Sequence, residues 1–494
     1  LYWRQWVVPA VCWTFFSIVL VFTLLCLNVI LRKRWTEAER LSYPIVQIPL
    51  ALTDPRPGFW RSPGLWIGFA LAGGVDVLNG FAYLYPSLPS LAYYGPAVDL
   101  QQFFPDHPWR AIGPTRADCY PFMIGLAYFL PMDIIFSTWF FYLVGKLMLV
   151  WGAVTGLQAL LPRYPYFPMQ AAGAVMAIAL VALWEARGYL LQVGRRALGL
   201  PSRLDDAGEA MSYRAAVLGA GGGALVLAWL AMTMGMSPLY VGIYFALFFL
   251  LALAVARLRA DSGAPAHGLA AVNPHEVLIA HTGTAGESPR HLTAMALCHW
   301  FNRFNRAHPM PQQLEAFKIA QVLRQDQRRM ALALMLAAIV TLALAFVIYP
   351  MLMYRHGAAL AAELIWTGWA TYGTAGLQGW LESPRLPDPA GIGCFWGGGA
   401  FALFLALMRA RFVWWPFHPM GYALGLGTTV DRWWCALLVC TLVKGAIVRY
   451  AGVRGYRRAA PFFAGLVLGQ YVVLCLWSLV AVIVEQPMYW SWLA

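Results

Sequence analysis

The stretch WVVPAVCWTFFSIVLVFTLLCLNVIL at residues 6–31 is almost entirely apolar and ends at the basic triplet Arg32-Lys33-Arg34. About 20 apolar residues in a helix are enough to cross the hydrocarbon core of a bilayer. Runs of this kind recur along the 494 residues, and the alternating ten-residue pattern of a membrane barrel does not. The sequence therefore predicts an all-α protein, a polytopic transmembrane helix bundle.

The composition supports this prediction and restricts the partners. Apolar residues make up 61% of the chain, and charged residues only 12%, about half the ~25% of a soluble domain. The formal charge of +13 could indicate nucleic-acid binding in a soluble protein, but membrane proteins place basic residues in cytoplasmic loops beside anionic lipid. We therefore expect a multi-pass protein of the cell (inner or plasma) membrane, with the lipid bilayer as partner and no nucleic acid.

The apolar runs predict about twelve crossings. About seven lie in residues 1–256 and about five in residues 330–494, on either side of a polar insertion at 257–329 that has no span of its own. The apolar run 119–161 is too long for one crossing, and we divide it near Lys146. A resemblance described below also implies further spans before Leu1.

The distribution of charge predicts which loops are cytoplasmic. Segment 257–329 has nine basic and five acidic residues, and segment 449–460 has four Arg and no acid. The positive-inside rule places both in the cytoplasm and the near-neutral segments 86–118 and 355–390 on the opposite side. These placements agree only if segment 412–429, which contains two prolines, also crosses. The alternative is that this segment re-enters on one side.

Two further segments are expected to be broken or re-entrant. Leu41–Leu52 has only twelve residues, interrupted by Pro44 and Pro49, and would be too short to cross even as a helix. Segment 358–381 is mixed in character, with Glu363 and many glycines. Such backbone is tolerated at membrane depth where protein or a water-filled cavity covers it.

Ionisable residues within the spans are the first candidates for function. Asp76 lies near the middle of the span 65–85, with Asn79 one helical turn further on. A charge at the bilayer centre costs about 2.5–3.5 kcal/mol on the mildest scale. We expect Asp76 and Asn79 to belong to a proton or cation pathway, with Asp133 as a further candidate beside the kink at Pro131; the alternative is a satisfied polar contact between helices.

The remaining chemistry-bearing residues form no recognisable motif. Six of the nine His fall between residues 267 and 308, but their spacings fit neither a helical pair nor a zinc finger. Phosphate-binding loops, nucleophile elbows and dinucleotide fingerprints are also missing from the sequence. We therefore expect no metal site, no cofactor and no enzymatic activity, and interpret the His-rich stretch as a polar cytoplasmic subdomain.

Several segments resemble an uncharacterised family of bacterial polytopic membrane proteins. The resemblance rests on segments in both halves of the chain: LRKRWTEAERLSYPIVQIPL (31–50), LWIGFALAGGVDVLNG (65–80), FSTWFFYLVGKLMLV (136–150), RLRADSGAPAHG (257–268), WFNRFNRAHPMPQQLEAFKIA (300–320) and RARFVWWPFHPMGYALG (409–425). That family distantly resembles the oligopeptide transporter superfamily, which includes the yellow-stripe-like metal-chelate transporters. The link rests on the number of spans and on Glu39-Arg40-Leu41-Ser42-Tyr43-Pro44; the transporters follow this proline with small residues, whereas this chain has Ile45-Val46-Gln47-Ile48.

Two functions remain open from the sequence. The first is a secondary transporter of small peptides or metal-chelate-like solutes, driven by protons; the resemblance supplies the solute class, and Asp76 and the proline-broken segments supply the physical argument. The second is a structural subunit without transport activity, in a homo-oligomer or a larger membrane complex. The 23 Trp would suit lateral contacts of that kind.

Overall fold

The fold is known from a computed structural model, which describes residues 3–53, 58–91, 99–263, 272–302, 307–357, 366–486 and 488–489. Among these residues the structure is helical, without named strands. The long helices are α1 (Trp3–Lys33), α3 (Pro63–Leu84), α5 (Met132–Thr155), α7 (Phe167–Ala197), α8 (Tyr213–Met234), α9 (Pro238–Ser262), α13 (Gln327–His356), α15 (Trp366–Glu382), α16 (Pro389–Arg411) and α18 (Trp434–Val484). The short α-helices are α2 (Gln47–Thr53), α4 (Pro121–Phe129), α6 (Leu157–Leu160), α10 (Pro274–Thr282), α11 (Pro289–Leu297), α12 (Pro309–Val322) and α17 (Pro419–Gly425). Single turns of other helix types are η1 (Arg34–Ala38), η2 (Pro44–Val46), η4 (Leu100–Phe103), η5 (Trp109–Ile112), η6 (Cys298–Trp300) and η7 (Thr428–Arg432).

Nine helices in the described part of the chain are long and apolar enough to cross a membrane. The last of them, α18, has 51 residues, about 76 Å if straight, against ~30 Å of hydrocarbon. Gly452 interrupts it with a positive φ of 61°, a conformation that glycine adopts at little cost. Phe122 of α4 contacts both arms. Its ring packs against Trp433, just before the first arm, and its backbone N–H donates to Gln470 Oε1 in the second arm. The two arms of α18 therefore run back past the same point.

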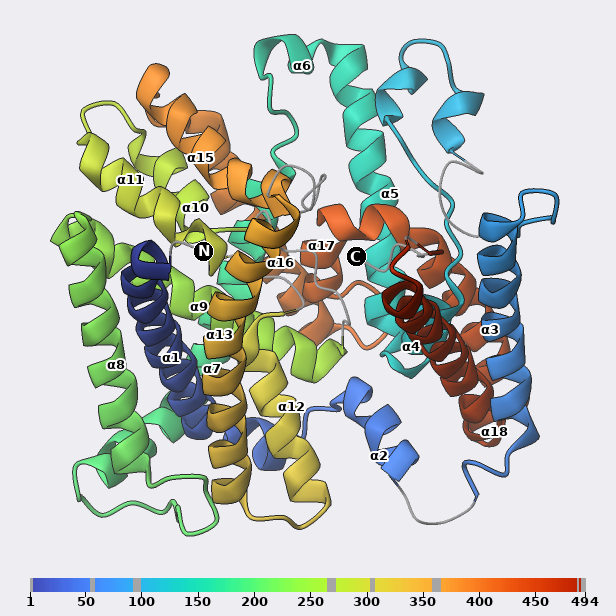
Figure 1. The fold of residues 1–494 in the computed structure, drawn as a ribbon, viewed down its shortest axis with the longest axis horizontal. Helices are drawn as coiled ribbons and strands as arrows, with labels where there is room; N and C mark the ends of the chain where they lie inside the picture. Colours follow the sequence, from blue (N-terminus) through green and yellow to red (C-terminus); the bar gives the residue numbers. More distant parts are fainter. Residues whose placement is uncertain are drawn as a thin grey trace. The chain divides into compact units, whose positions relative to one another are not determined.

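The chain divides into two compact units. Unit 1 contains residues 1–42, 175–260 and 270–393, and unit 2 contains residues 43–174, 261–269 and 394–494. In unit 1, α1 packs against α8, α12 and α13 (Figure 1). Gly219 and Gly223 of α8 face Cys26 and Thr23 of α1 so closely that a Cβ at either glycine would overlap them. This close approach permits tight van der Waals packing of two helices, which drives helix association in lipid.

Unit 2 is organised around α18. Its second arm packs against α3, where a Cβ on Gly68 would lie 2.1 Å from the backbone oxygen of Phe462, and one on Gly465 would lie 2.1 Å from that of Leu65. Helix α4 packs between the two arms, and Tyr128 stacks on Phe463 there. Helix α17 packs along α5. Small residues therefore set the spacing of these helices.

Two sequence predictions about individual segments can now be compared with the structure. Segment 41–52 forms only η2 and α2, with Pro44 and Ile48 buried, and neither helix is long enough to span a bilayer; that the segment does not cross stays a prediction. The division of run 119–161 near Lys146 is wrong: the helices separate at Leu130 and Pro131, because proline there begins a new helix rather than continuing the old one. Residues 358–365, which include Glu363, lie outside the described residues.

Candidate functional site

The segment after α9 folds back along the whole length of that helix. Near the start of α9, the hydroxyl of Tyr240 donates a 2.7 Å hydrogen bond to Glu287 Oε1. Near its end, Arg259 forms a two-pronged ion pair with Glu315, with a shortest distance of 2.6 Å. Tyr240 and Arg259 are separated by about 28 Å of helix. The chain between Glu287 and Glu315 therefore traverses a distance comparable with the hydrocarbon core of a bilayer.

This traverse is made by broken helices rather than by one span. Helix α11 and the turn η6 cover its first part, and α12 covers its last part. Between them the described residues 301–302 and 307–308 are not helical. Each of α10, α11 and α12 begins with a proline at its first turn, at Pro274, Pro289 and Pro309, the position where a missing N–H costs nothing.

A cluster of buried polar side chains lies at the break, and we call it the Asn302 cluster. The side-chain amide of Asn302 donates to the hydroxyl of Tyr244 at 3.0 Å and lies 2.7 Å from His275 Nδ1. The imidazole of His299 packs edge-on against that of His275, and the ring of Trp380 in α15 lies 5.9 Å from the His275 ring. Asn302 and Tyr244 are completely buried.

The hydrogen-bond pattern determines what this cluster can offer to a ligand. Since the Asn302 amide nitrogen only donates, the Nδ1 of His275 accepts, and a neutral His275 then has its proton on Nε2. Tyr244 accepts from Asn302 and also shares a hydrogen bond with Cys298, while the Nε2 of His275 lies 3.6 Å from Glu276 Oε1. Among the described residues no three His, Cys, Asp or Glu side chains are arranged to hold a metal ion. The arrangement is suited to hydrogen bonding with a polar solute.

A second layer of buried amides joins the break to α1. Asn28, completely buried near the end of α1, donates to the backbone oxygen of Met310 at 2.8 Å and to Gln313 Oε1 at 2.9 Å. Gln313 in turn donates to the backbone oxygen of Val21. These bonds fix α12 directly against α1.

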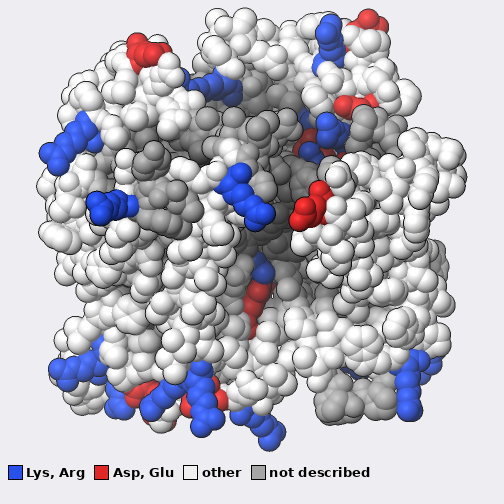
Figure 2. Space-filling model, viewed as in Figure 1, with Lys and Arg blue, Asp and Glu red and all other residues white. Residues whose placement is uncertain are grey.

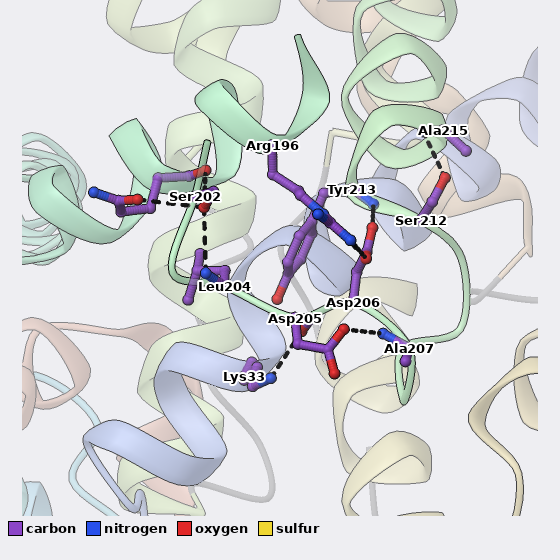
Figure 3. A network of polar contacts seen from close by, with 11 residues as sticks. Lys33, Arg196, Ser202, Leu204, Asp205, Asp206, Ala207, Ser212, Tyr213 and Ala215 are labelled. Atoms are coloured by element: carbon purple, nitrogen blue, oxygen red, sulfur yellow. Dashed lines mark hydrogen bonds and ion pairs between the residues drawn. The ribbon is translucent and has the colours of Figure 1, made fainter. Parts of the chain in front are cut away.

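One end of unit 1 is rich in basic residues, and ion pairs hold the loop between α7 and α8 in place there. Arg32 at the end of α1 binds Glu209 at 2.7 and 2.8 Å, with the two side chains only 4% and 2% exposed. In the same loop Asp206 accepts from Arg196 and from the backbone N–H of Tyr213 (Figure 3). Figure 2 shows basic side chains gathered below α7, α8 and α12. The exposed arginines here are Arg195, Arg196, Arg203, Arg214, Arg324, Arg328 and Arg329.

The opposite end of unit 1 changes the expected topology. There the backbone N–H of Thr284 donates to the oxygen of Arg385, and the N–H of Asp388 donates to the oxygen of Ala280. The sequence placed 257–329 and 355–390 on opposite sides, and these two placements cannot both hold for residues that hydrogen-bond to one another. The prediction failed because segment 257–329 does not stay at one end of the helices: it contacts α9 near both of its ends.

Unit 2 contains a second interrupted segment, between α16 and α18. Arg409 forms a 2.7 Å ion pair with Asp133 at the start of α5, and Asp431 pairs with Lys146 further along the same helix. The chain between Arg409 and Asp431 therefore advances about 20 Å along α5, with only the seven residues of α17 as α-helix. This is the segment 412–429 that was expected to cross. Asp133, a candidate for the ion pathway, is thus paired with a guanidinium.

Asp76 and Asn79 lie in unit 2 on α3. Asp76 is completely buried, and its Oδ1 accepts a 3.1 Å hydrogen bond from the hydroxyl of Tyr489. Trp477 of α18 donates to the backbone oxygen of Asp76. Asn79 exchanges two hydrogen bonds with the backbone of Leu91. The structure thus buries Asp76 and gives Asn79 a local structural contact, while their part in an ion pathway stays a prediction.

Sequence reasoning missed the residues of the Asn302 cluster. The concentration of His between residues 267 and 308 was the correct signal, but its low hydropathy suggested a polar subdomain. Four of these residues, His275, His291, His299 and His308, are buried, and His267 lies outside the described residues. The helix-starting prolines within the same stretch were the second available signal, since a solvated loop has no need of three helix starts.

Comparison with known proteins gives the family of the chain. The chain belongs to the DUF6785 family, a family of unknown function, and the match covers residues 1–493. No curated protein matches the sequence.

Proposed function

We propose that this protein is a proton-driven secondary transporter of small polar solutes, of the peptide or metal-chelate-like class. The observation that supports it most is the interrupted traverse from Glu287 to Glu315, with the buried Asn302 cluster at its break. Discontinuous crossings that expose polar groups at membrane depth are where many secondary transporters bind their solute. A protein with only a scaffold role would gain nothing from burying such groups.

In this proposal the Asn302 cluster binds the solute. The Tyr244 hydroxyl and the Nε2–H of His275 would exchange their present contacts with Cys298 and Glu276 for solute carbonyl or carboxylate oxygens, and Trp380 supplies an apolar wall. The bonds among the cluster's own members hold its side chains in place, so that little conformational entropy is lost on binding. Solute contact would displace the Asn302 amide from one of its present partners, which couples binding to movement of the break.

Asp76 is the group that we propose for proton binding. An ionised carboxyl is costly at membrane depth, and Asp76 is completely buried. Its contact with Tyr489 OH gives the carboxyl a neutral partner with which either protonation state can hydrogen-bond. Uptake or release of the proton would therefore change the electrostatics between α3 and α18 without breaking an ion pair at that oxygen.

Proton flux into proteoliposomes tests the proposal. The full chain is reconstituted with an internal pH-sensitive dye and given di- and tripeptides or metal chelates under an imposed proton gradient. The proposal predicts solute-dependent acidification, lost in Asp76→Asn and kept in Glu382→Gln, a matched change of an exposed carboxyl. Equal flux in Asp76→Asn would remove this carboxyl from the mechanism. No flux with any solute would favour the alternative, a structural subunit of a larger membrane complex.

A further inference from the structure

Two cysteines that are far apart in the sequence face each other in unit 2. The sulfur atoms of Cys119 and Cys435 lie 3.2 Å apart, although 316 positions separate the residues along the chain. Cys119 lies just before α4, and Cys435 is the second residue of α18. Both side chains are partly exposed. A disulfide has an S–S length of about 2.05 Å, so an approach of about 1 Å separates these thiols from a covalent bond.

The backbone around the two thiols is already held in register. The indole of Trp434 donates a 2.8 Å hydrogen bond to the backbone oxygen of Arg116, which brings the start of α18 against the segment before α4. The ammonium of Lys146 donates to the backbone oxygen of Pro114 and forms an ion pair with Asp431. These contacts join residues 114–116 to residues 431–434, a few positions before each thiol in the chain, so closure needs no large movement.

We propose that Cys119 and Cys435 form a disulfide in the cell, a covalent staple between the segment before α4 and the start of α18. The oxidant is a disulfide of an extracytoplasmic thiol oxidoreductase or of a small molecule. Cys119 attacks one sulfur of that disulfide and forms a mixed disulfide, and Cys435 then attacks Cys119 Sγ. The oxidant leaves as two thiols, which take up the two protons lost by the cysteines.

Two further observations bear on formation of this disulfide. The hydrogen bond between the two thiols lowers the pKa of Cys119 to about 7, against the opposing effects of burial and of the nearby Asp118 carboxylate. Thiolate is the reactive form, and a pKa near the ambient pH gives the fastest exchange. The charge distribution also places segment 86–118 away from the cytoplasm, where disulfides persist.

Counting blocked thiols in the full chain tests the proposal. Cells that produce the protein are quenched with acid, free thiols are alkylated, and the membranes are then reduced and treated with a maleimide polymer. Two of the eight sulfurs should gain polymer only after reduction, and digestion of a sample that is not reduced should yield one peptide pair that joins residues 119 and 435. Cys119→Ser or Cys435→Ser should abolish both signals.

A neighbouring cysteine provides the control. Cys440→Ser removes a buried thiol one turn and a half further along α18, and the pair should remain blocked in this variant. Mass spectrometry of the wild type needs no variant and therefore does not depend on how well a serine variant folds. Recovery of both Cys119 and Cys435 as alkylated thiols from the quenched cells would overturn the proposal.

Discussion

The side-chain amide of Asn302 lies 2.7 Å from Nδ1 of His275, which joins the break after η6 to the first turn of α10. Both residues belong to a stretch whose composition resembles that of a solvated loop, and both are buried. A buried polar group without a hydrogen-bond partner would cost ~1–3 kcal/mol. The contact therefore gives two buried polar side chains at the break a partner in each other, and our account of a solute path rests on it.

Cysteine labelling tests the topology of unit 1. Thr293 of α11 and Ala207 in the loop before α8 are both exposed. They lie near opposite ends of unit 1, which α8 spans with a length of about 31 Å. In intact cells an impermeant maleimide should label Thr293→Cys and not Ala207→Cys, because the basic end belongs in the cytoplasm. Labelling of both positions, or of Ala207→Cys alone, would contradict this arrangement.

The buried ion pair between Arg32 and Glu209 makes a strong prediction about stability. Arg32→Met leaves the Glu209 carboxylate buried without its guanidinium, and the loss should be about 3–5 kcal/mol. Thermal unfolding in detergent measures the change. The double variant Arg32→Met/Glu209→Leu should recover most of the loss, since an apolar pair has no desolvation penalty. A double variant as unstable as Arg32→Met alone would show that the pair is not the cause.

Close helix packing in unit 2 gives a prediction with an internal control. In Gly68→Ala the new Cβ would meet the backbone oxygen of Phe462, whereas in Gly74→Ala on the same helix it would meet nothing within 4 Å. Gly68→Ala should force α3 away from α18 and cost about 1–3 kcal/mol. Gly74→Ala should be neutral or slightly stabilising. Equal melting temperatures for the two variants would refute the packing of α3 against α18.

The lowered pKa of Asp206 predicts that the protein loses stability in acid. Partial burial alone would raise the pKa of Asp206, but hydrogen bonds from Arg196 and from the Tyr213 N–H outweigh it, so its pKa lies below the usual 3.8. A carboxyl with a lowered pKa stabilises the folded state above about pH 4, and this contribution disappears as the pH falls through the folded pKa.

Comparison of two neighbouring carboxyls isolates this contribution. Asp206→Asn should lower stability at pH 7 by up to ~1 kcal/mol, since Arg196 is partly exposed, and should flatten the acid limb of the stability curve between about pH 5 and 2. Asp205→Asn keeps the Arg196 pair and serves as the control. An unchanged acid limb in Asp206→Asn would contradict the assignment.

The sequence predicted the long spans of this fold well and its broken segments poorly. Runs such as 6–31 form helices because an apolar segment lies in lipid, where no water can bond its backbone. Each backbone group must then find its partner within the same helix. A kink was expected at Pro131, but the division between helices was placed at Lys146, although Pro131 is where one helix ends and the next begins. Asp76 was identified from its cost in lipid alone. The Asn302 cluster could not be, because its members become neighbours only when residues 274–322 fold along α9.

Solvent access to Cys298, beside the break, tests the central claim most directly. Cys298 and Cys440 are both completely buried, and each can be kept as the sole cysteine of the chain. If the break belongs to a solute path that opens to water, a small water-soluble thiol reagent should modify Cys298 in native membrane vesicles and should spare Cys440 in the core of unit 2. Cys298 as unreactive as Cys440 at physiological temperature would contradict the account of a transport path through this break.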